Sequence, residues 1–378
     1  MSQGLVLRDR RTKGEEMKKI VPIAIAGAAF AAGAAGVAYV AKLSASRRKS
    51  IATIEKLTDY PDDYNLYSMS IFYNYDLDAV ITRGLDDDQS MIDSFVKEAL
   101  PYMPVHINAP KFGCTTFTMA QSDRGVRMGR SYDFALDSSA MLVHCAPKNG
   151  YKSVATAALD NITANTPEEQ FPKRLACLLS PFVCLDGMNE KGVSIAVLTL
   201  DSEPVHHKTE KPTICTSMAI RLVLDRAATT AEAVELLSSY DMFASSGRDY
   251  HFYISDASGD GRIVEYDCDS PERKLVATKS LAATNFYVMH KDKVLPYQKN
   301  GHYGHGRERY DAVLEVLEEE RGNFCDEAAW RALKACAQDP TPQDITSNTQ
   351  WSIVYDNTNL KAHIAIRRNW EDVFSYSV

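Results

Sequence analysis

The 378-residue sequence lacks any CxxC pair. This absence argues against the zinc ribbons and dithiol redox motifs that depend on that spacing. Eight cysteines are also far too few for a disulfide-held scaffold in a chain of this length. We expect most of them to be small buried apolar side chains, with an isolated bridge or two left open. The eight residues are Cys114, Cys145, Cys177, Cys184, Cys215, Cys268, Cys325 and Cys336.

Positive charge is scarce after residue 49. The chain has 42 Lys and Arg against 50 Asp and Glu, but ten of the basic residues and only three of the acidic ones lie in residues 1–49. The remainder is therefore strongly acidic, and this argues against a nucleic-acid binder, because phosphate contacts need Lys and Arg. A charged content of 24% and an aromatic content of 9% exclude a disordered or low-complexity chain.

The basic head flanks a run of 22 residues without charge, from Ile20 to Ala41. A helix of that length would span roughly 33 Å, close to the hydrocarbon thickness of a bilayer. We predict a basic cytoplasmic head over 1–19 and a transmembrane signal anchor over 20–42. A cleaved signal peptide starting near Met17 and a buried Ala-rich helix remain as alternatives. We expect a single-pass protein of the cell membrane whose catalytic domain lies outside the cytoplasm, or else a secreted protein.

The body divides into a lead-in or propeptide over 43–113 and a main domain over 114–378. The lead-in holds one predicted helix, 88–100, which ends before Pro101. In the main domain, short β-like runs alternate with pairs of amphipathic helices. Helices are predicted over 213–227, 229–240, 307–320 and 327–337. The order of strands, helices, strands, helices and strands predicts an α+β domain with antiparallel sheets rather than a doubly wound parallel fold.

Cys114 begins a predicted hairpin that turns near Gly125. Pairing about that turn would bring Arg130 and Asp133 back to the Cys114 end of the hairpin. A guanidinium favours the reactive thiolate, and a carboxylate can hold a cationic partner. Cleavage after the small, flexible Gly113 would give Cys114 a free α-amine, which can act as the base for its own thiol. Residue types alone also permit an ordinary strand cysteine beside a surface ion pair.

Six ordered segments resemble the choloylglycine hydrolase and penicillin V acylase family, linear amide C–N hydrolases of the N-terminal nucleophile superfamily. The resemblance begins with Cys114-Thr-Thr-Phe and Gly129-Arg-Ser-Tyr-Asp-Phe. It continues through Asp186-Gly-Met-Asn-Glu-Lys-Gly-Val, His251-Phe-Tyr-Ile-Ser-Asp-Ala-Ser-Gly, Ala283-Thr-Asn, Gly306-Arg-Glu-Arg-Tyr and Trp351-Ser-Ile-Val-Tyr-Asp. It covers about 265 residues, from Cys114 to Val378.

The resemblance implies a four-layer αββα fold and amide hydrolysis by an N-terminal cysteine. By the resemblance, Cys114 is the nucleophile, its amine is the base, and Arg130 lies beside the thiolate. Asp133 would hold the amine, Asn285 would donate to the oxyanion, and Arg309 would complete the charged network. Arg307 competes with Arg309 for this role, and the tyrosine that follows Arg309 favours the latter.

The sequence departs from the family pattern at three places. Ser131 stands where many members have Asn, with little expected effect. Thr199 occupies the position of an Asn that helps form the oxyanion hole in bile salt hydrolases, which argues against a typical bile-salt enzyme. Cys114 also lies far from the N-terminus, so the resemblance implies autocleavage before it, because signal-peptide processing alone cannot reach that bond.

No cofactor and no metal site are expected. His302 and His305 have a spacing that could suit a metal, but no Cys or carboxylate partner is evident from the sequence, so we assign the pair to a loop. The predicted partners are a small-molecule amide and the membrane through residues 20–41, with no nucleic acid; a homo-oligomer is left open. The predicted function is hydrolysis of an N-acyl amide of the penicillin V or conjugated bile acid type. The alternatives are an acyltransferase on the same scaffold and an inactive anchored binding protein.

Overall fold

Two β-sheets form the centre of the protein in a computed structural model, which describes residues 43–100, 113–121, 123–341 and 346–378. The nine-stranded sheet has the order β1-β2-β5-β6-β7-β8-β11-β12-β13. Its strands are β1 (Glu55–Lys56), β2 (Leu66–Ile71), β5 (Ala140–Cys145), β6 (Ser153–Ala158), β7 (Cys184–Asn189), β8 (Ser194–Leu200), β11 (Asp249–Ser255), β12 (Gly261–Tyr266) and β13 (Leu275–Lys279). Neighbouring strands are antiparallel except for the parallel pair β2 and β5.

The six-stranded sheet has the order β14-β3-β4-β15-β16-β17 and is antiparallel throughout. Its strands are β3 (Gly113–Gln121), β4 (Gly125–Asp133), β14 (Ala282–Ala283), β15 (Thr349–Asp356), β16 (Lys361–Ile366) and β17 (Val373–Ser377). Every residue of β15 is buried, as is every residue of β8 in the other sheet. Strands that bury both faces must be covered on both sides, so these two lie in the interior.

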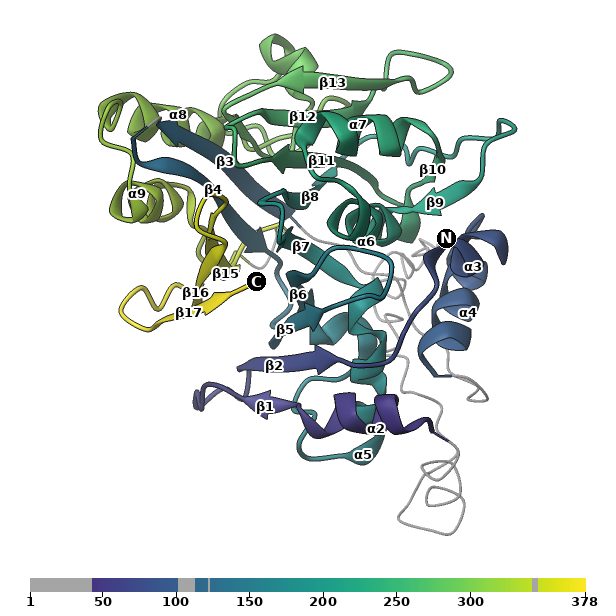
Figure 1. Cartoon of the computed structure of the whole chain (residues 1–378). Coiled ribbons are helices and arrows are strands. Elements are labelled where there is room, and N and C mark those ends of the chain that lie inside the picture. Colours follow the sequence, from purple (N-terminus) through teal and green to yellow (C-terminus); the bar gives the residue numbers. More distant parts are fainter. Residues whose placement is uncertain (1–42, 101–112, 122, 342–345) are drawn as a thin grey trace, which may run out of the picture.

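Helices cover the outer faces of both sheets (Figure 1). Helices α6 (Thr216–Arg226) and α7 (Thr230–Ser238) pack on the nine-stranded sheet, mainly on β7, β8, β11 and β12. Helices α8 (Arg307–Glu319) and α9 (Asp326–Cys336) pack on β3, β4, β14 and β15 of the six-stranded sheet. The sheets meet where β3 faces β8 and β11. The layers therefore run helices, sheet, sheet, helices, and the predicted α+β class is confirmed.

The helix predicted over 213–227 begins later than expected. Thr213–Cys215 is a short strand, β9, which pairs in parallel with β10 (Asp241–Phe243). The helix starts only at Thr216. Amphipathic spacing alone did not reveal this pairing, because it depends on a segment that follows α7. The neighbouring helix α7 does carry its predicted cap, since Thr229 accepts a hydrogen bond from the Glu232 N–H.

The segment predicted as a lead-in is part of the nine-stranded sheet. It contributes β1, β2, α2 (Ala45–Ala52), α3 (Leu77–Thr82) and α4 (Asp88–Ala99). All six residues of β2 pair with β5, which belongs to the main domain. Tyr73 donates a hydrogen bond to the Leu178 carbonyl at 2.6 Å, and Tyr75 donates to Asp225 at 3.3 Å. The segment therefore packs into the core of the fold rather than preceding it as a loose peptide.

The predicted membrane segment over 20–42 and the basic head over 1–19 lie outside the described residues. Within the described residues, no helix is both long and apolar enough to cross a bilayer. All eight cysteines are free thiols. Six of them are buried and two are partly exposed, so most of them are the buried apolar side chains that the sequence predicted.

Candidate active site

The β3–β4 hairpin places the predicted nucleophile beside two of its predicted partners. The strands pair about Gly125, whose φ of +83° suits the turn. Cys114 lies opposite Tyr132, and Gly113 lies opposite Asp133. The predicted hairpin register is therefore confirmed, and it brings Arg130 and Asp133 to the Cys114 end.

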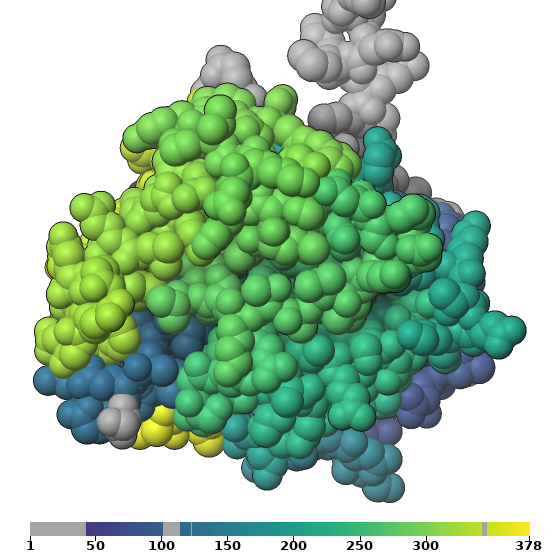
Figure 2. All heavy atoms as spheres, turned by 90° about the horizontal axis from the view of Figure 1, so that it is seen from above, coloured from purple at the N-terminus to yellow at the C-terminus, as the bar shows by residue number. Residues whose placement is uncertain are grey.

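Cys114 is fully buried in this uncleaved chain. Viewed from above, segments that follow β11 cover most of the visible face, and the β3–β4 region emerges at one edge (Figure 2). Burial raises the pKa of the Cys114 thiol to about 12, while Arg130 lowers it and Asp133 raises it. The thiol is thus protonated at neutral pH, and Arg130 is the neighbour that favours the thiolate.

Arg130 is held by a carboxylate that the sequence reasoning did not single out. Its Nε lies 3.3 Å from Oδ2 of Asp186, and both side chains are completely buried. Asp186 also accepts hydrogen bonds from the Tyr355 hydroxyl at 2.6 Å and from the Trp351 indole at 3.4 Å. A buried carboxylate needs hydrogen-bond donors, and Tyr355 and Trp351 supply them to Asp186. The sequence signal was Asp186 itself, the first residue of a segment interpreted only as a turn and strand.

Asn285 and Arg309 reach the start of β3 from distant parts of the chain. They lie 171 and 195 residues after Cys114. The Cys114 N–H donates to Oδ1 of Asn285 at 3.2 Å, and Arg309 Nη1 donates to the Cys114 carbonyl at 3.0 Å. Arg309 Nη2 also donates to Oδ1 of Asn285 at 2.6 Å. One network therefore fixes both backbone polar groups of the predicted nucleophile.

Asp133 lies on the other side of this network. Its Oδ2 is 3.6 Å from Arg309 Nη1 and accepts from the Gln338 amide at 2.8 Å. Its Oδ1 accepts from the Thr349 hydroxyl at 2.7 Å. Burial raises the pKa of the Asp133 carboxyl, and Arg309, Thr349 and Gln338 each lower it. Gln338 and Thr349 complete the site, and no sequence pattern pointed to them.

Thr199 contacts the network through its backbone. Its carbonyl accepts from the Asn285 amide at 3.0 Å, while its hydroxyl donates to the Asp249 carbonyl at 3.4 Å. In this uncleaved form, both the Thr199 hydroxyl and the Asn285 amide therefore have protein acceptors. An oxyanion role for Thr199 remains a prediction.

The competing candidates lie elsewhere. Arg307 forms an ion pair with Asp311 at 2.8 Å and does not join the Cys114 network. His305 accepts or donates at both ring nitrogens, with Asp201 at 2.7 Å and Thr346 at 2.9 Å. The preference for Arg309 over Arg307 thus matches the geometry around Cys114.

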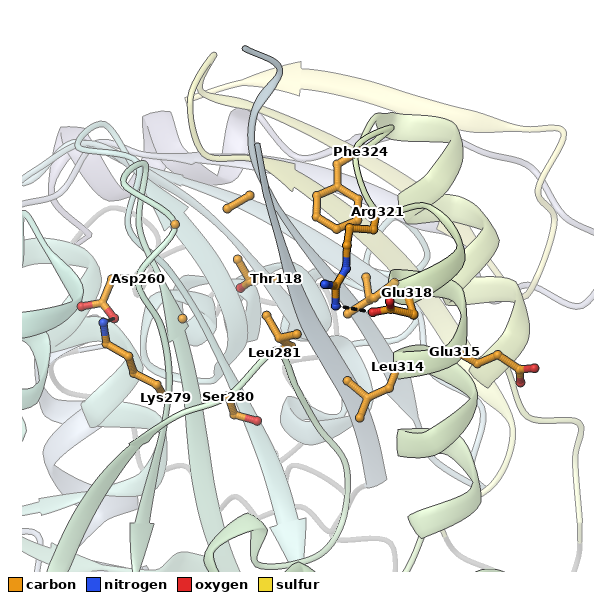
Figure 3. A pocket seen from close by; sticks show the side chains of 14 residues that line it. Thr118, Asp260, Lys279, Ser280, Leu281, Leu314, Glu315, Glu318, Arg321 and Phe324 are labelled. Atoms are coloured by element: carbon orange, nitrogen blue, oxygen red, sulfur yellow. Dashed lines mark hydrogen bonds and ion pairs between the residues drawn. The ribbon is translucent and has the colours of Figure 1, made fainter. Parts of the chain in front are cut away.

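A cavity of about 740 Å³ opens at the far end of β3. Thr118 and Leu281 line it together with Leu314 and Phe324 (Figure 3). At about 3.3 Å per residue, Thr118 lies roughly 13 Å along the strand from Cys114. This cavity is therefore separate from the predicted nucleophile, and geometry around the reacting atom is the better guide to the active site.

Comparison with known proteins points to one family of amide hydrolases. Residues 114–272 match the family model described as linear amide C–N hydrolases, choloylglycine hydrolase family. A search of curated proteins gives no significant match. Among solved structures, penicillin V acylase from Agrobacterium tumefaciens is similar, with a TM-score of 0.51 and 20% identity over 70% of this chain and 86% of that chain. A variant of conjugated bile acid hydrolase from Clostridium perfringens gives 0.51 and 16% identity, over 70% and 92%.

The matched segment starts at Cys114, the first residue of the predicted catalytic domain. The fold and the match define a hydrolase that acts on linear amide C–N bonds. Residues 114–272 are thus similar to the choloylglycine hydrolase family.

Proposed function

We propose that the protein is a cysteine-dependent amidase that becomes active when the Gly113–Cys114 bond is cut. The observation that carries the proposal is the network in which Asn285 and Arg309 bind the backbone N–H and carbonyl of Cys114. A strand cysteine without a catalytic role would not require these contacts. They hold in place the one nitrogen that would become a free α-amine.

The reaction follows from these positions. The α-amine takes the thiol proton, and the Cys114 thiolate attacks the acyl carbon of the amide. Hydrogen-bond donors stabilise the oxyanion, and the carbon–nitrogen bond then breaks as the ammonium returns its proton to the leaving amine. Water next attacks the acyl thioester, releases the carboxylic acid and restores the thiol. Arg130 stabilises the thiolate, and Asp133 balances the positive charge of the amine and of Arg309.

Activation uses the same sulfur. Sγ of Cys114 attacks the Gly113 carbonyl carbon, and the acyl group moves from nitrogen to sulfur. The C–N bond breaks in this shift, and the nitrogen takes up the thiol proton, so the Cys114 amine is free. Water then hydrolyses the thioester, which restores the Cys114 thiol and leaves a carboxylate on Gly113. Residue 113 is a glycine and carries no side chain that could hinder this attack.

The substrate class is a linear N-acyl amide. The names of the similar structures suggest penicillin V and conjugated bile acids as the first compounds to test. Thr199 replaces the Asn expected in bile salt hydrolases, and its hydroxyl is bonded to the Asp249 carbonyl. We therefore expect weaker activity on conjugated bile acids than on simple N-acyl amides.

Intact mass spectrometry and an amide panel test the proposal together. The wild-type chain should be cut before Cys114 and should hydrolyse at least one amide of the panel. Cys114→Ala should remain uncut and inactive, whereas Cys177→Ala, which removes a buried cysteine outside the site, should behave as wild type. An uncut wild-type chain whose Cys114→Ala form hydrolyses amides equally well would refute it. Acyl transfer to an added amine would identify the acyltransferase alternative.

We also propose that residues 20–41 export or anchor the protein, on the strength of their length, apolar character and basic flanks. Fractionation of cells that express the full chain should place it in the membrane or outside the cell. Protease added to intact spheroplasts should digest the body. Protection of the body in a soluble cytosolic fraction would contradict this placement.

A further inference from the structure

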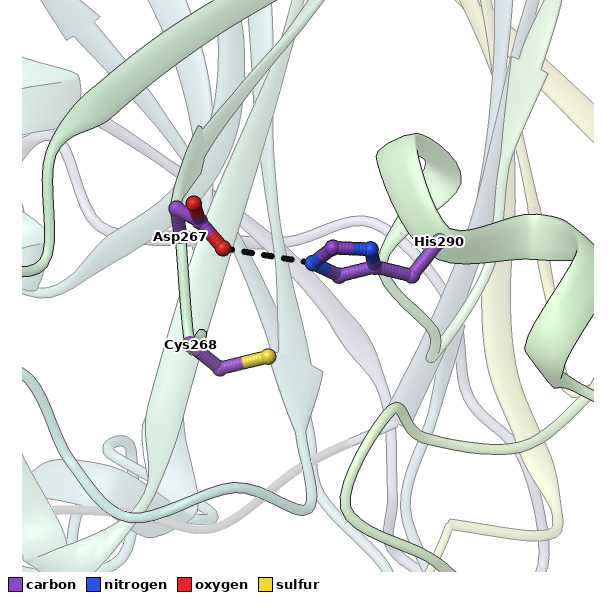
Figure 4. A group of neighbouring side chains, drawn as sticks. All are labelled: Asp267, Cys268 and His290. Carbon is purple, nitrogen blue, oxygen red and sulfur yellow. Dashed lines mark hydrogen bonds and ion pairs between the residues drawn. The ribbon is translucent and has the colours of Figure 1, made fainter. Parts of the chain in front are cut away.

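A cluster of metal-ligating side chains lies outside the proposed active site. Asp267 and Cys268 follow β12, and His290 lies in the 3₁₀ segment η5 (Val288–Lys293) (Figure 4). Their ligand atoms all lie within 4.8 Å of one another. Cys268 also forms a second such group with Asp269 and His302. Three separate stretches of chain thus bring thiol, imidazole and carboxylate groups together around one sulfur.

The distances within the cluster are compatible with one bound ion. His290 Nε2 is 3.2 Å from Oδ1 of Asp267, and His302 Nε2 is 3.5 Å from Oδ1 of Asp269. Ligands of a tetrahedral zinc ion lie about 2.0–2.3 Å from the metal, and hence roughly 3.3–3.8 Å from one another. The spacing of His290 and Asp267 is close to that value, and the ligand atoms of each group lie within 4.8 Å of the Cys268 sulfur, so side-chain rotations would complete a coordination sphere.

The charges around the cluster favour a cation. Asp267 and Asp269 flank Cys268 in sequence, and Lys293 is bonded to Asp269 at 2.9 Å. Lys293 therefore neutralises Asp269, but the described contacts place no cation on Asp267. A bound metal would take Cys268 as the thiolate, and the thiol proton would pass to solvent.

We propose that Asp267, Cys268 and His290 form a binding site for a thiophilic divalent cation such as Zn²⁺, with His302 of the second group as a fourth ligand that reaches the ion beside the shared Cys268 sulfur. The mixed sulfur, nitrogen and oxygen ligand set is typical of zinc and unlike the all-oxygen sets that calcium and magnesium prefer. Cys268 is the shared ligand, and its proton leaves when the ion binds. Asp269 keeps its contact with Lys293. This site revises the expectation of no metal and gives His302 the cysteine and carboxylate partners that its sequence neighbourhood did not reveal.

The site would clamp the chain segment that carries two predicted catalytic residues. His290 lies five residues after Asn285, and His302 lies seven residues before Arg309. An ion bound to both histidines and to the end of β12 would fix the intervening loop against the nine-stranded sheet. We therefore assign the ion a structural role, and the proposal does not depend on the proposed amidase activity.

Titration of Zn²⁺ into the full-length Cys114→Ala chain, freed of metal by chelation, tests the site without interference from the predicted nucleophile. We expect one Zn²⁺ per chain by calorimetry, with proton release. Co²⁺ should give a thiolate-to-cobalt charge-transfer band. Cys268→Ser should abolish the band and weaken Zn²⁺ binding at least about tenfold. Cys325→Ser, a control at a partly exposed cysteine in neither group, should retain both.

A second variant tests the same site if Cys268→Ser folds poorly. His302 is exposed, so His302→Ala should fold normally, keep the cobalt band and bind Zn²⁺ more weakly. Zn²⁺ should also protect residues 290–305 from hydrogen exchange in the parent chain. Absence of stoichiometric binding, unchanged affinity in Cys268→Ser, or unchanged affinity in His302→Ala would each overturn the proposed four-ligand site.

Discussion

Gly306 lies directly against the guanidinium of Arg309: a Cβ added at position 306 would overlap Nη2 of Arg309. Gly306 is also the residue before α8, with a φ of +84°. The same glycine therefore permits the left-handed entry into the helix and leaves room for the side chain that binds the Cys114 carbonyl. Arg309 is positioned as much by this empty volume as by its hydrogen bonds.

Gly306→Ala should slow both cleavage before Cys114 and amide turnover by about 10²-fold or more, because it displaces Arg309 from the Cys114 network. Gly322→Ala is the matched control: Gly322 has the same φ of +84°, but a Cβ there meets nothing within 4 Å. The control should lose about 1–2 kcal/mol of stability and keep its activity. Intact mass spectrometry measures the cleavage rate, and substrate assays measure amide turnover. Equal rate losses in both variants would contradict the prediction.

Asp186→Asn should destabilise the fold by about 3–5 kcal/mol, because it leaves the buried Arg130 charge without its carboxylate. The partly exposed pair of Arg307 and Asp311 provides the control, and Asp311→Asn should cost at most about 1 kcal/mol. Urea unfolding of the two variants beside the Cys114→Ala parent gives the comparison. A loss below about 1 kcal/mol for Asp186→Asn would show that Arg130 does not depend on this partner.

Alkaline pH should destabilise the protein through its buried thiols. Burial raises the pKa of Cys177 to about 12, whereas an unfolded cysteine titrates near pH 8.5–9. The folded chain keeps a proton that the unfolded chain releases. This contribution is therefore complete below about pH 8.5 and is lost as the pH rises toward 12. Each such thiol lowers the free energy of unfolding by about 1.4 kcal/mol per pH unit in that window.

Cys177→Ala isolates one of these thiols. Its lost packing should lower the unfolding free energy by a constant amount, while the decline between pH 9.5 and 11 should become shallower by about 1.4 kcal/mol per pH unit. Urea titrations under reducing conditions measure both quantities. Parallel pH curves for the parent and the variant would show that Cys177 does not retain its proton.

The lead-in should remain bound after the proposed cut. Its strand β2 pairs with β5 along six residues, and Tyr73 and Tyr75 are hydrogen-bonded to the main domain. Native gel filtration of cut protein should therefore give one peak containing both pieces, which separate only in denaturant. Loss of the 43–113 piece under native conditions would contradict this. It would also support the interpretation of residues 43–113 as a propeptide.

The sequence could predict what depends on local pattern. The turn near Gly125 defined the β3–β4 hairpin, and the family resemblance identified Cys114, Asn285 and Arg309 as partners. It could not predict that β2 belongs to the main sheet, because the parallel pair β2 and β5 joins strands separated by a whole hairpin of the other sheet. Asp186, Gln338 and Thr349 were missed for the same reason: their contacts join segments with no local signal.

The parallel pairing of β2 with β5 affects whether the protein can refold after cleavage. The Gly113–Cys114 bond lies in the crossover between these two adjacent strands. While that bond is intact, the two strands pair within one chain, which gives them a high effective concentration during folding. After the cut, the same pairing becomes a bimolecular association, with no covalent link to favour it over aggregation. The cut protein is therefore expected to hold its structure but not to regain it, so cleavage would convert a reversible fold into a kinetically trapped assembly.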